Sequence, residues 1–320
     1  MKIILITPAG KQSKTGNRTT AMRWARLLRE IGHRVSIQTE WDGTAASMMV
    51  AIHAWRSASS IQRFRQQYPA RPLVVLLSGT DIYRFQHSHP RDTRGSLALA
   101  DALVALHELV HRAIPEQFKG KLQVIHQSAL PLTGARSPSK RSFDVCVIGH
   151  LREEKDPLRT AYAARAVAAG SRLRVFQLGK AHDDAWAKTA REEMQVNPRY
   201  RWLGEVGAGR VRQELSKTHA MVLSSIMEGG ANVISEAIVA GVPVIASKID
   251  GNVGLLGEDY PGYYPARDTA ALRALLERSE NNPAYLQELS EHGAKRKYLF
   301  SPQHEREAWK ALLHRLSSSQ

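Results

Sequence analysis

Continuous apolar runs alternate with segments of helical periodicity along most of this chain. The runs "KIILIT" (2–7), "PLVVLLSG" (72–79) and "FDVCVIGH" (143–150) are long enough for strands and carry no polar alternation. Segments such as "NRTTAMRWARLLREIG" (17–32) lie between them and show the spacing of an amphipathic helix. Strands that are apolar on both faces and are separated by helices are typical of a parallel sheet covered on both sides. The pattern predicts the α/β fold class.

The segment "ALPLTGARSPSKRS" (129–142) interrupts this alternation and then lets it restart. It is rich in Pro, Ser, Gly and charge, which indicates a linker. We therefore predict two doubly wound, Rossmann-like domains, covering residues 1–133 and 140–320, with helices at the C-terminal end. In tandem domains of this kind the active site is expected in the cleft between them, at the carboxyl ends of the strands.

The charge balance favours anionic partners. The chain has 45 Lys and Arg against 30 Asp and Glu, a formal net charge of +15 over 320 residues. Nucleic acid, anionic lipid and phosphorylated small molecules all fit such a charge. The basic residues are scattered at helix-surface spacing, and no recognised nucleic-acid module is present, so we expect no nucleic-acid partner.

Other features bear on the compartment. No apolar run approaches the roughly 20 residues that span a bilayer, so we expect no membrane anchor. The beginning "MKIILITPAGK" is too strand-like for a signal peptide. The single cysteine, Cys146, fits a reducing cytoplasm and lies in a strand-like run, which predicts a buried core thiol.

The strongest functional signal is "MEGGANVISEAIVAGVPVIAS" (227–247), which follows the apolar run "AMVLSSI" (220–226). We interpret it as a strand, a glycine turn, a helix opened by Glu236, and a second strand. Two glycines at such a turn let a ligand approach the backbone, and a helix N-terminus suits a phosphate. Glu228 and Glu236 lie about two helical turns apart, and a carboxylate can accept hydrogen bonds from a ribose diol.

A second strand end carries cations. "GHLREEKDP" (149–157) places Arg152 and Lys155 just before a helix. Two cations beside a helix N-terminus can clamp a diphosphate. Both pieces lie at strand ends of one predicted sheet, which indicates a nucleotide diphosphate site.

These two motifs resemble the donor site of GT-B glycosyltransferases of the retaining, glycogen-synthase-like superfamily, whose E-x7-E motif matches Glu228 and Glu236. The resemblance implies catalytic roles for Glu228, Arg152 and Lys155. Arg152 and Lys155 would bind the donor diphosphate, Glu236 the ribose, and Glu228 would lie near the sugar. The remaining donor contacts would be backbone amides of Gly229, Gly230, Ala231 and Asn232. No metal and no cofactor is expected, because side-chain cations and helix dipoles neutralise the leaving diphosphate.

The loop "KQSKTGNRTT" (11–20) is the candidate acceptor site. It joins the first strand to a helix that Asn17 or Thr19 could cap. Its density of anion-binding groups suits a small oxyanion better than a sugar hydroxyl, although an ordinary, well-capped loop would look similar. The acceptor-binding residues predicted here are Lys14, Gly16, Asn17, Arg18 and Thr19.

Polar residues at other strand ends have two interpretations each. "LSGTDIYRF" (77–85) resembles the "HGTD" strand end of these transferases, with Ser78 where the family often has His, so no catalytic His is carried over. Asp81 either orients the sugar or acceptor, or caps the local structure. His107 and His126 are either site residues or part of the core.

A narrower resemblance extends from the first strand to about residue 270. The sequence is similar to the SenB-type selenosugar synthases of selenoneine biosynthesis. This resemblance implies a cytoplasmic enzyme that transfers a sugar from UDP-glucose or UDP-N-acetylglucosamine to selenophosphate, in functional coupling with the other enzymes of that pathway. A conventional GT-B glycosyltransferase with a glycolipid or polysaccharide acceptor is the alternative. The segments that carry the resemblance are "TPAGKQSKTGNRTTAMRWARLLREIGHRV", "LSGTDIY", "GHLREEKDPLR", "MEGGANVISEAIVAGVPVIAS" and "DGNVGLLGEDYPGYYP".

Overall fold

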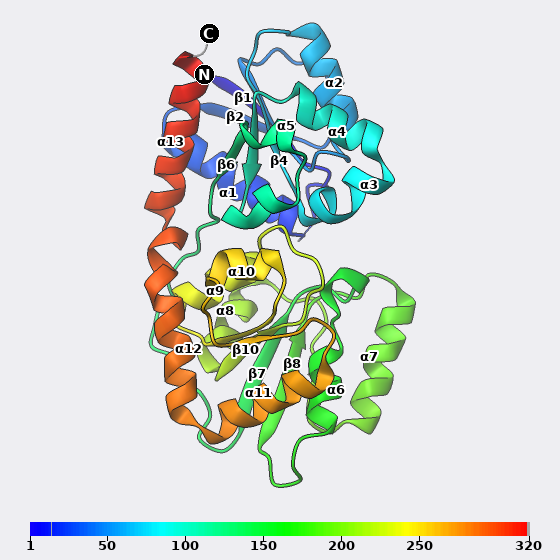
Figure 1. Ribbon diagram of the computed structural model, residues 1–320, viewed down its shortest axis with the longest axis vertical. Coiled ribbons are helices and arrows are strands. Elements are labelled where there is room, and N and C mark those ends of the chain that lie inside the picture. Colours follow the sequence, from blue (N-terminus) through cyan, green and yellow to red (C-terminus); the bar gives the residue numbers. More distant parts are fainter. Residues whose placement is uncertain (14, 319–320) are drawn as a thin grey trace. The chain divides into compact units, whose positions relative to one another are not determined.

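The structure is a computed structural model that describes residues 1–13 and 15–318 (Figure 1). It divides into two compact units. The N-terminal unit comprises Met1–Ser128 together with Leu299–Gln320, and the C-terminal unit comprises Ala129–Tyr298.

The N-terminal unit is built on a parallel sheet with the strand order β2-β1-β3-β4-β5-β6. Its strands are β1 (Lys2–Ile6), β2 (Arg34–Gln38), β3 (Met48–Ile52), β4 (Leu73–Leu76), β5 (Ala102–Ala105) and β6 (Leu122–Val124). Its helices are α1 (Gly16–Glu30), α2 (Ala58–Gln67), the π-helix η1 (Asp81–Phe85), α3 (Gln86–Ser88), α4 (Pro90–Leu99), η2 (Glu108–Arg112), α5 (Glu116–Lys119) and α13 (Pro302–Ser318).

Successive residues of the central strands enter opposite halves of the core. In β1, Ile3 and Leu5 pack with Trp24 of α1, whereas Ile4 and Ile6 pack with Phe64 of α2. The four β1 residues are fully buried. Because both faces of the sheet are covered by helices, the inner strands β3, β4 and β5 are apolar at every position, whereas the edge strand β2 carries polar residues.

The C-terminal unit contains a second parallel sheet with the order β12-β11-β10-β7-β8-β9. Its strands are β7 (Phe143–Ile148), β8 (Leu173–Leu178), β9 (Tyr200–Trp202), β10 (Ala220–Leu223), β11 (Val244–Ser247) and β12 (Tyr263–Tyr264). Its helices are η3 (Glu153–Lys155), α6 (Arg159–Arg165), α7 (Asp184–Val196), α8 (Ala208–Lys217), α9 (Asn232–Val239), α10 (Asp250–Leu256), α11 (Thr269–Asn281) and α12 (Pro283–Arg296), and η4 (Lys297–Phe300) leads back to the N-terminal unit. The predicted α/β class with two doubly wound sheets is confirmed.

The strand order fixes where each sheet can bind a ligand. In the C-terminal unit the chain starts at β7, passes to β8 and β9 on one side, and then to β10, β11 and β12 on the other. The connections that follow β7 and β10 therefore run in opposite directions across the sheet, towards β8 and towards β11. Such a topological switch point opens a crevice at the carboxyl ends of the strands.

The C-terminal helix α13 belongs to the N-terminal unit, whereas the sequence prediction assigned all of residues 140–320 to the second domain. Trp309 of α13 is fully buried and packs edge-to-face on Trp24, with ring centroids 4.8 Å apart. The buried carboxylate of Glu305 accepts hydrogen bonds from Arg23, Trp24 and Ser128. These contacts bring α13 to α1 and explain the difference.

The predicted linker (129–142) is attached to the C-terminal unit. Its residue Arg136 donates to the carbonyl oxygens of Gly241, at 2.5 Å, and Thr218, at 2.6 Å. Both acceptors lie just before strands of the second sheet, so the domain boundary falls near Ser128.

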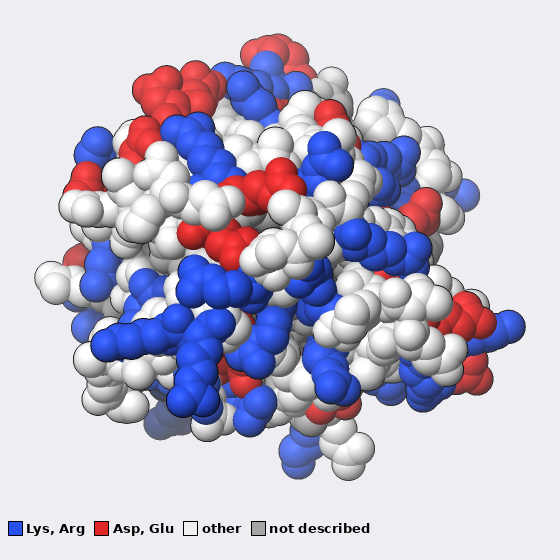
Figure 2. Space-filling view, turned by 90° about the horizontal axis from the view of Figure 1, so that it is seen from below, with Lys and Arg blue, Asp and Glu red and all other residues white. Residues whose placement is uncertain are grey.

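Basic side chains are prominent on the surface. Figure 2 shows a face on which Lys and Arg side chains gather in the lower left of the view, among acidic and uncharged neighbours. Within the part of the chain that the structure describes, no helix is both long and apolar enough to cross a membrane.

Candidate functional site

The loops that follow β7 and β10 are neighbours at the carboxyl edge of the second sheet. The two strands pair in parallel, with Val147 beside Val222. The backbone N–H of Ile226 donates to the carbonyl oxygen of Glu154 at 2.9 Å, and Ser224 Oγ donates to that of Asp156 at 2.8 Å. Hydrogen bonds therefore hold the loop that carries Lys155 against the loop that carries Glu228.

Lys155 and Glu228 form an ion pair at this junction. Lys155 Nζ donates to Glu228 Oε1, and only 17% and 10% of the two side chains are exposed. The hydroxyl of Ser225 donates to the same carboxylate oxygen at 2.6 Å. The structure thus brings together two of the predicted catalytic residues, and the partial burial strengthens their attraction.

Arg152, the third predicted catalytic residue, lies at the rim of the site. Its side chain is 45% exposed, and its Nε is 3.8 Å from Glu154 Oε2. It directly precedes η3, with an extended backbone. Arg152 can therefore reach a ligand above the strand ends, while its charge is exposed to water.

His150 lies beside these cations, and the sequence analysis did not single it out. Its Nδ1 accepts a hydrogen bond from the backbone N–H of Lys180, at 3.1 Å. Burial lowers the pKa of His150, and the positive charges of Arg152 and Lys155 lower it further. A neutral imidazole beside two cations is suited to hydrogen bonding rather than to charge pairing.

The glycine turn leads into α9 as the sequence predicts. Gly229 is buried, and Gly230 has a φ of 125°, a backbone conformation that L side chains rarely adopt. Ala231 is the N-cap residue of α9, and its side chain makes no capping hydrogen bond. The first backbone N–H groups of α9 therefore form a helix N-terminus of the kind that binds phosphate.

One detail of the prediction was wrong. Glu236 does not open the helix, because α9 already begins at Asn232. Glu236 lies one turn further along and is half-buried. A single turn separates it from the helix N-terminus, which is close enough for both to contact one nucleotide.

The first turn of α10 packs directly on Glu228. A Cβ atom at Gly251 would overlap the carbonyl oxygen and the Cβ of Glu228. Only glycine fits at this position, because the obstructing atoms belong mainly to the backbone. Gly251 therefore helps to set the height of Glu228 above the strand ends.

The predicted acceptor loop lies at the carboxyl end of β1 in the N-terminal unit. Lys14 is outside the described residues. Gly16 and Thr19 are exposed, and Asn17 and Arg18 are half-buried in the first turn of α1. The predicted caps were wrong, because α1 begins at Gly16 and its N-cap residue is Thr15. Asn17 and Thr19 lie one residue and three residues inside the helix.

Hydrogen bonds fix this end of α1. Thr19 Oγ1 donates to the carbonyl oxygen of Thr15, at 3.3 Å, and Thr15 Oγ1 lies 2.9 Å from Ser13 Oγ. Gln127, just after β6, donates to the hydroxyl of the buried Thr20, at 2.7 Å. The loop is thereby held at the carboxyl edge of the first sheet, where a ligand can reach it.

Asp81 has the structural role that the sequence left open. Its buried carboxylate accepts hydrogen bonds from the backbone N–H groups of Ala54, Trp55 and Ser78, at 2.8–3.0 Å. It also contacts His53 Nδ1 at 2.7 Å. These partners occupy both oxygens, so Asp81 holds the turn after β3 and is not placed to bind an acceptor directly.

The sequence does not single out His53, because nothing in "VAIHAW" (50–55) distinguishes it from a core residue. It is 2% exposed and has a φ of 77°. Such a backbone is strained for a non-glycine residue. The contact with Asp81 and a 3.2 Å contact from Nε2 to Thr80 Oγ1 hold it in place.

The two histidines that the sequence placed at strand ends, His107 and His126, lie in the interior. His107 is fully buried, and among the described residues neither of its ring nitrogens has a hydrogen-bond partner. His126 is also buried and lies 3.2 Å from Glu108 Oε1. Cys146 is a buried core thiol as predicted, and burial raises its pKa to about 12, so it stays protonated.

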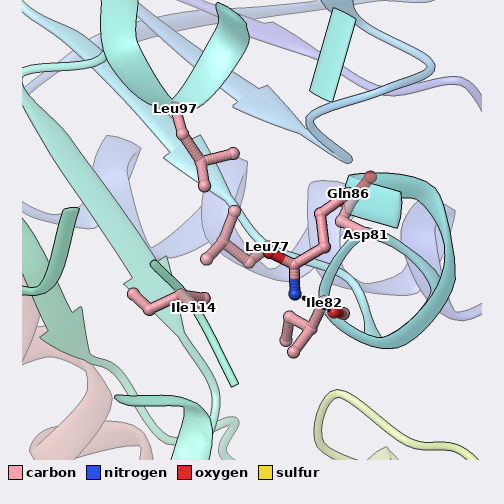
Figure 3. Close-up of a pocket in the computed structure, with 6 residues that line it drawn as sticks. All are labelled: Leu77, Asp81, Ile82, Gln86, Leu97 and Ile114. Carbon is pink, nitrogen blue, oxygen red and sulfur yellow. Dashed lines mark hydrogen bonds between the residues drawn. The ribbon is translucent and has the colours of Figure 1, made fainter. Parts of the chain in front are cut away.

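A small hollow in the N-terminal unit is not a substrate site. Figure 3 shows Asp81 and Gln86 beside apolar side chains around it. Gln86 donates to the carbonyl oxygens of Ile82 and Ala113, so its amide group stabilises the local backbone. The lining residues are at most 5% exposed: Leu77, Asp81, Ile82, Gln86, Leu97 and Ile114.

Comparison with known protein families shows the family to which the chain belongs. Residues 135–296 match the family described as "Glycosyl transferases group 1", and this segment is just over half of the sequence. The chain therefore belongs to this family and is a glycosyltransferase. The matched segment contains both strand-end loops described above.

Solved structures show the same GT-B fold over the full length. HepE from Anabaena, crystallised with UDP, has a TM-score of 0.77 at 16% identity and is matched over 99% of this chain and 100% of its own. A sucrose-phosphate synthase from Thermosynechococcus elongatus has a TM-score of 0.78 at 16% identity over 100% of both chains. A glycosyltransferase from Rickettsia africae has a TM-score of 0.74 at 12% identity, over 100% of this chain and 99% of its own.

Proposed function

We propose that the C-terminal unit binds a UDP-sugar at the carboxyl ends of β7 and β10. The observation that carries this proposal is the Lys155–Glu228 pair, which joins a cation and a carboxylate across two hydrogen-bonded loops beside the N-terminus of α9. HepE has been crystallised with UDP and with UDP-glucose, which supports UDP as the nucleotide.

The residues have separate tasks in this proposal. Lys155, Arg152 and the backbone amides of the 229–232 turn bind the diphosphate, and Glu236 accepts hydrogen bonds from the ribose. Glu228 faces the sugar. As the bond between the anomeric carbon and the diphosphate oxygen breaks, its electron pair goes to UDP. The positive groups then stabilise the charge that develops on this leaving group, which is the task of a metal ion elsewhere.

The proposed acceptor is selenophosphate, and this part rests on the resemblance to selenosugar synthases. The selenium atom attacks the anomeric carbon and forms the carbon–selenium bond as UDP leaves. Water then cleaves the selenium–phosphorus bond, giving a 1-selenosugar and phosphate. Selenium is a soft nucleophile, and positioning therefore contributes more than a general base.

The acceptor oxyanion would be held at the start of α1. Arg18 is half-buried in the first turn, and Gly16 and Asn17 precede it. The N-terminus of a 15-residue helix attracts an anion, and the neighbouring cation adds to this. Selenophosphate is small enough to bind there without an apolar surface.

Mass spectrometry of the product tests this proposal. The purified protein is incubated with UDP-glucose or UDP-N-acetylglucosamine, with and without selenophosphate. We expect a sugar product with the isotope pattern of selenium, formed together with UDP and phosphate, and only when selenophosphate is present. Lys155→Ala is the matched inactive control.

A conventional acceptor gives a different outcome. UDP release that needs a glycolipid or polysaccharide, without any selenium-containing sugar, would replace selenophosphate by that alternative while keeping the donor site. Absence of UDP-sugar turnover with every acceptor would contradict the donor proposal as well.

A further inference from the structure

A chain of buried contacts leads from Asn252 of α10 to Glu228 and passes through the backbone of Ser225. Asn252 Nδ2 of α10 donates to Ser247 Oγ at 3.1 Å, and Ser247 Oγ donates to the carbonyl oxygen of Ser225 at 2.5 Å. Ser225 Oγ then donates to Glu228 Oε1 at 2.6 Å. Asn252, Ser247 and Ser225 are fully buried. The chain crosses from α10 through the ends of β11 and β10 to the carboxylate.

Ser247 acts on the backbone of Ser225, whereas the side chain of Ser225 acts on Glu228. Asn252 orients the Ser247 hydroxyl, and that hydroxyl fixes the carbonyl group of Ser225 and thereby the backbone that carries the Ser225 side chain. A serine hydroxyl has a single proton, and that of Ser225 is directed at Glu228 Oε1. Because these groups are buried, water cannot replace a lost member cheaply.

Lys155 and Ser225 engage the same oxygen of Glu228. An ammonium group has three N–H donors, so Lys155 can contact Glu228 and still offer two donors to a diphosphate. With Oε1 occupied by the protein, Oε2 is the oxygen suited to accept hydrogen bonds from a sugar hydroxyl. One oxygen of Glu228 thus binds the protein, and the other is left for the sugar.

We propose that Ser225 is a positioning residue that orients Glu228 towards the donor sugar, and that Ser247 and Asn252 hold Ser225 in place. This inference rests on the proposed function of Glu228. Gly251, the neighbour of Asn252 in α10, packs directly on Glu228, and a side chain there would push the Glu228 backbone away. The sugar is recognised through Glu228, whereas the diphosphate is bound by other groups.

Binding measurements with two ligands distinguish recognition of the sugar from binding of the diphosphate. Calorimetry with UDP alone measures the nucleotide and diphosphate contacts, and calorimetry with UDP-glucose adds the sugar contacts. The quantity to compare is the affinity for UDP-glucose divided by the affinity for UDP, called the ratio below. Ser225→Ala should lower this ratio by about tenfold, the usual effect of removing a buried hydrogen bond to a charged group, while the affinity for UDP stays unchanged.

A double-mutant cycle shows whether Ser225 acts through Glu228. Glu228→Ala alone should lower the ratio, and adding Ser225→Ala should lower it no further, because the partner is already absent. Ser225→Cys keeps a weak donor and should restore part of the ratio. Ser247→Ala, one step further back, should show a smaller effect in the same direction and replaces Ser225→Ala if that variant does not fold.

Ser279→Ala is the control for loss of a buried serine hydroxyl. Ser279 is fully buried in α11 of the same unit. An unchanged ratio in Glu228→Ala would overturn the role of Glu228 at the sugar, and this inference with it. A lowered ratio in Glu228→Ala but not in Ser225→Ala or Ser247→Ala would overturn the positioning role alone. Loss of UDP affinity in Ser225→Ala would show that it holds the diphosphate loop instead.

Discussion

At the scale of single residues, burial decides what each charged group of the site can contribute. Lys155 is 17% exposed and paired, whereas Arg152 is 45% exposed. An exposed charge is screened by water and salt, so its contribution is discounted. Lys155 is thus the main cation of the proposed diphosphate site, and Arg152 a secondary one.

This difference gives a prediction for UDP binding. Lys155→Ala should weaken the affinity for UDP by about 2–4 kcal/mol, and Arg152→Ala by about 1–2 kcal/mol. Isothermal titration calorimetry measures both, with the exposed Lys188→Ala of α7 as a control that should change nothing. Unchanged affinity in both site variants would remove the diphosphate from this place.

His107 predicts a dependence of stability on pH. Burial lowers its pKa from the usual 6.5 to about 4, with the charge of His126 lowering it further and Glu108 opposing this. As the pH falls below 6.5, the unfolded chain takes up this proton before the folded one. The stabilisation by neutral His107 is therefore complete above pH 6.5 and is lost progressively down to about pH 4.

Urea unfolding at pH 7.5 and pH 4.5 measures this contribution. The wild-type protein should lose about 2–4 kcal/mol more than His107→Leu over this range. The exposed His87→Leu should behave like the wild type. An equal loss in all three proteins would show that His107 does not titrate in this way.

At the scale of elements, the sequence predicted the strands and the turns that carry the motifs. The apolar runs identify β7 and β10, and the glycine turn before α9 follows from Gly229 and Gly230. The sequence could not show that Ser225 donates a hydrogen bond to Glu228, or that Gly251 packs on Glu228. Such contacts depend on how α10 folds back on the sheet, which periodicity does not specify.

Helix starts were the least predictable part. Asn17 and Thr19 have side chains suited to an N-cap, yet Thr15 occupies that position in α1. Asn and Thr both favour N-caps, so the local sequence alone does not choose among these three positions. The role of Asp81 was ambiguous for a similar reason, since a buried carboxylate can serve either a ligand or backbone N–H groups.

The first turn of α1 predicts an effect confined to the acceptor. Arg18→Ala should raise the KM for selenophosphate about tenfold, the usual effect of losing one charge-assisted hydrogen bond, with UDP affinity unchanged. Steady-state kinetics and calorimetry test the two parts. Arg26→Ala is the control, because Arg26 is exposed on the same helix and lies 3.6 Å from Glu30. Equal damage to acceptor and UDP binding would place the acceptor elsewhere.

At the scale of the whole molecule, the return of the chain to the N-terminal unit was not predictable. The helical pattern of 302–318 indicates an amphipathic helix, but it does not say which core buries it. The contacts of two residues place this helix on the N-terminal core. Trp309 packs on Trp24, and Glu305 accepts hydrogen bonds from Arg23 and Ser128. The two-sheet organisation was predictable because the strand–helix alternation restarts after the linker. The cleft between the domains stays a prediction.

Removal of Trp309 tests the anchoring of α13. Trp309→Ala should lower the free energy of unfolding by about 3–5 kcal/mol, the range for emptying a large buried aromatic site. Urea denaturation measures this, with the exposed His314→Ala of the same helix as control. A loss below about 1 kcal/mol, similar to that of a surface substitution, would show that α13 is not an integral part of this core.

Activity is also expected to survive removal of metal ions. Within the described residues, no group of three or more His, Cys, Asp or Glu could hold a metal ion. In the proposed site Lys155, Arg152 and the start of α9 neutralise the departing diphosphate. Turnover measured with and without EDTA should be equal. Loss of activity that Mg²⁺ restores would contradict this proposal.

A crystal structure with UDP tests the central claim most directly. We expect the diphosphate at the carboxyl ends of β7 and β10, within hydrogen-bond distance of Lys155 Nζ and of backbone N–H groups at the start of α9. The ribose should contact Glu236. A diphosphate bound away from these strand ends, for example at the first turn of α1, would contradict the proposed donor site.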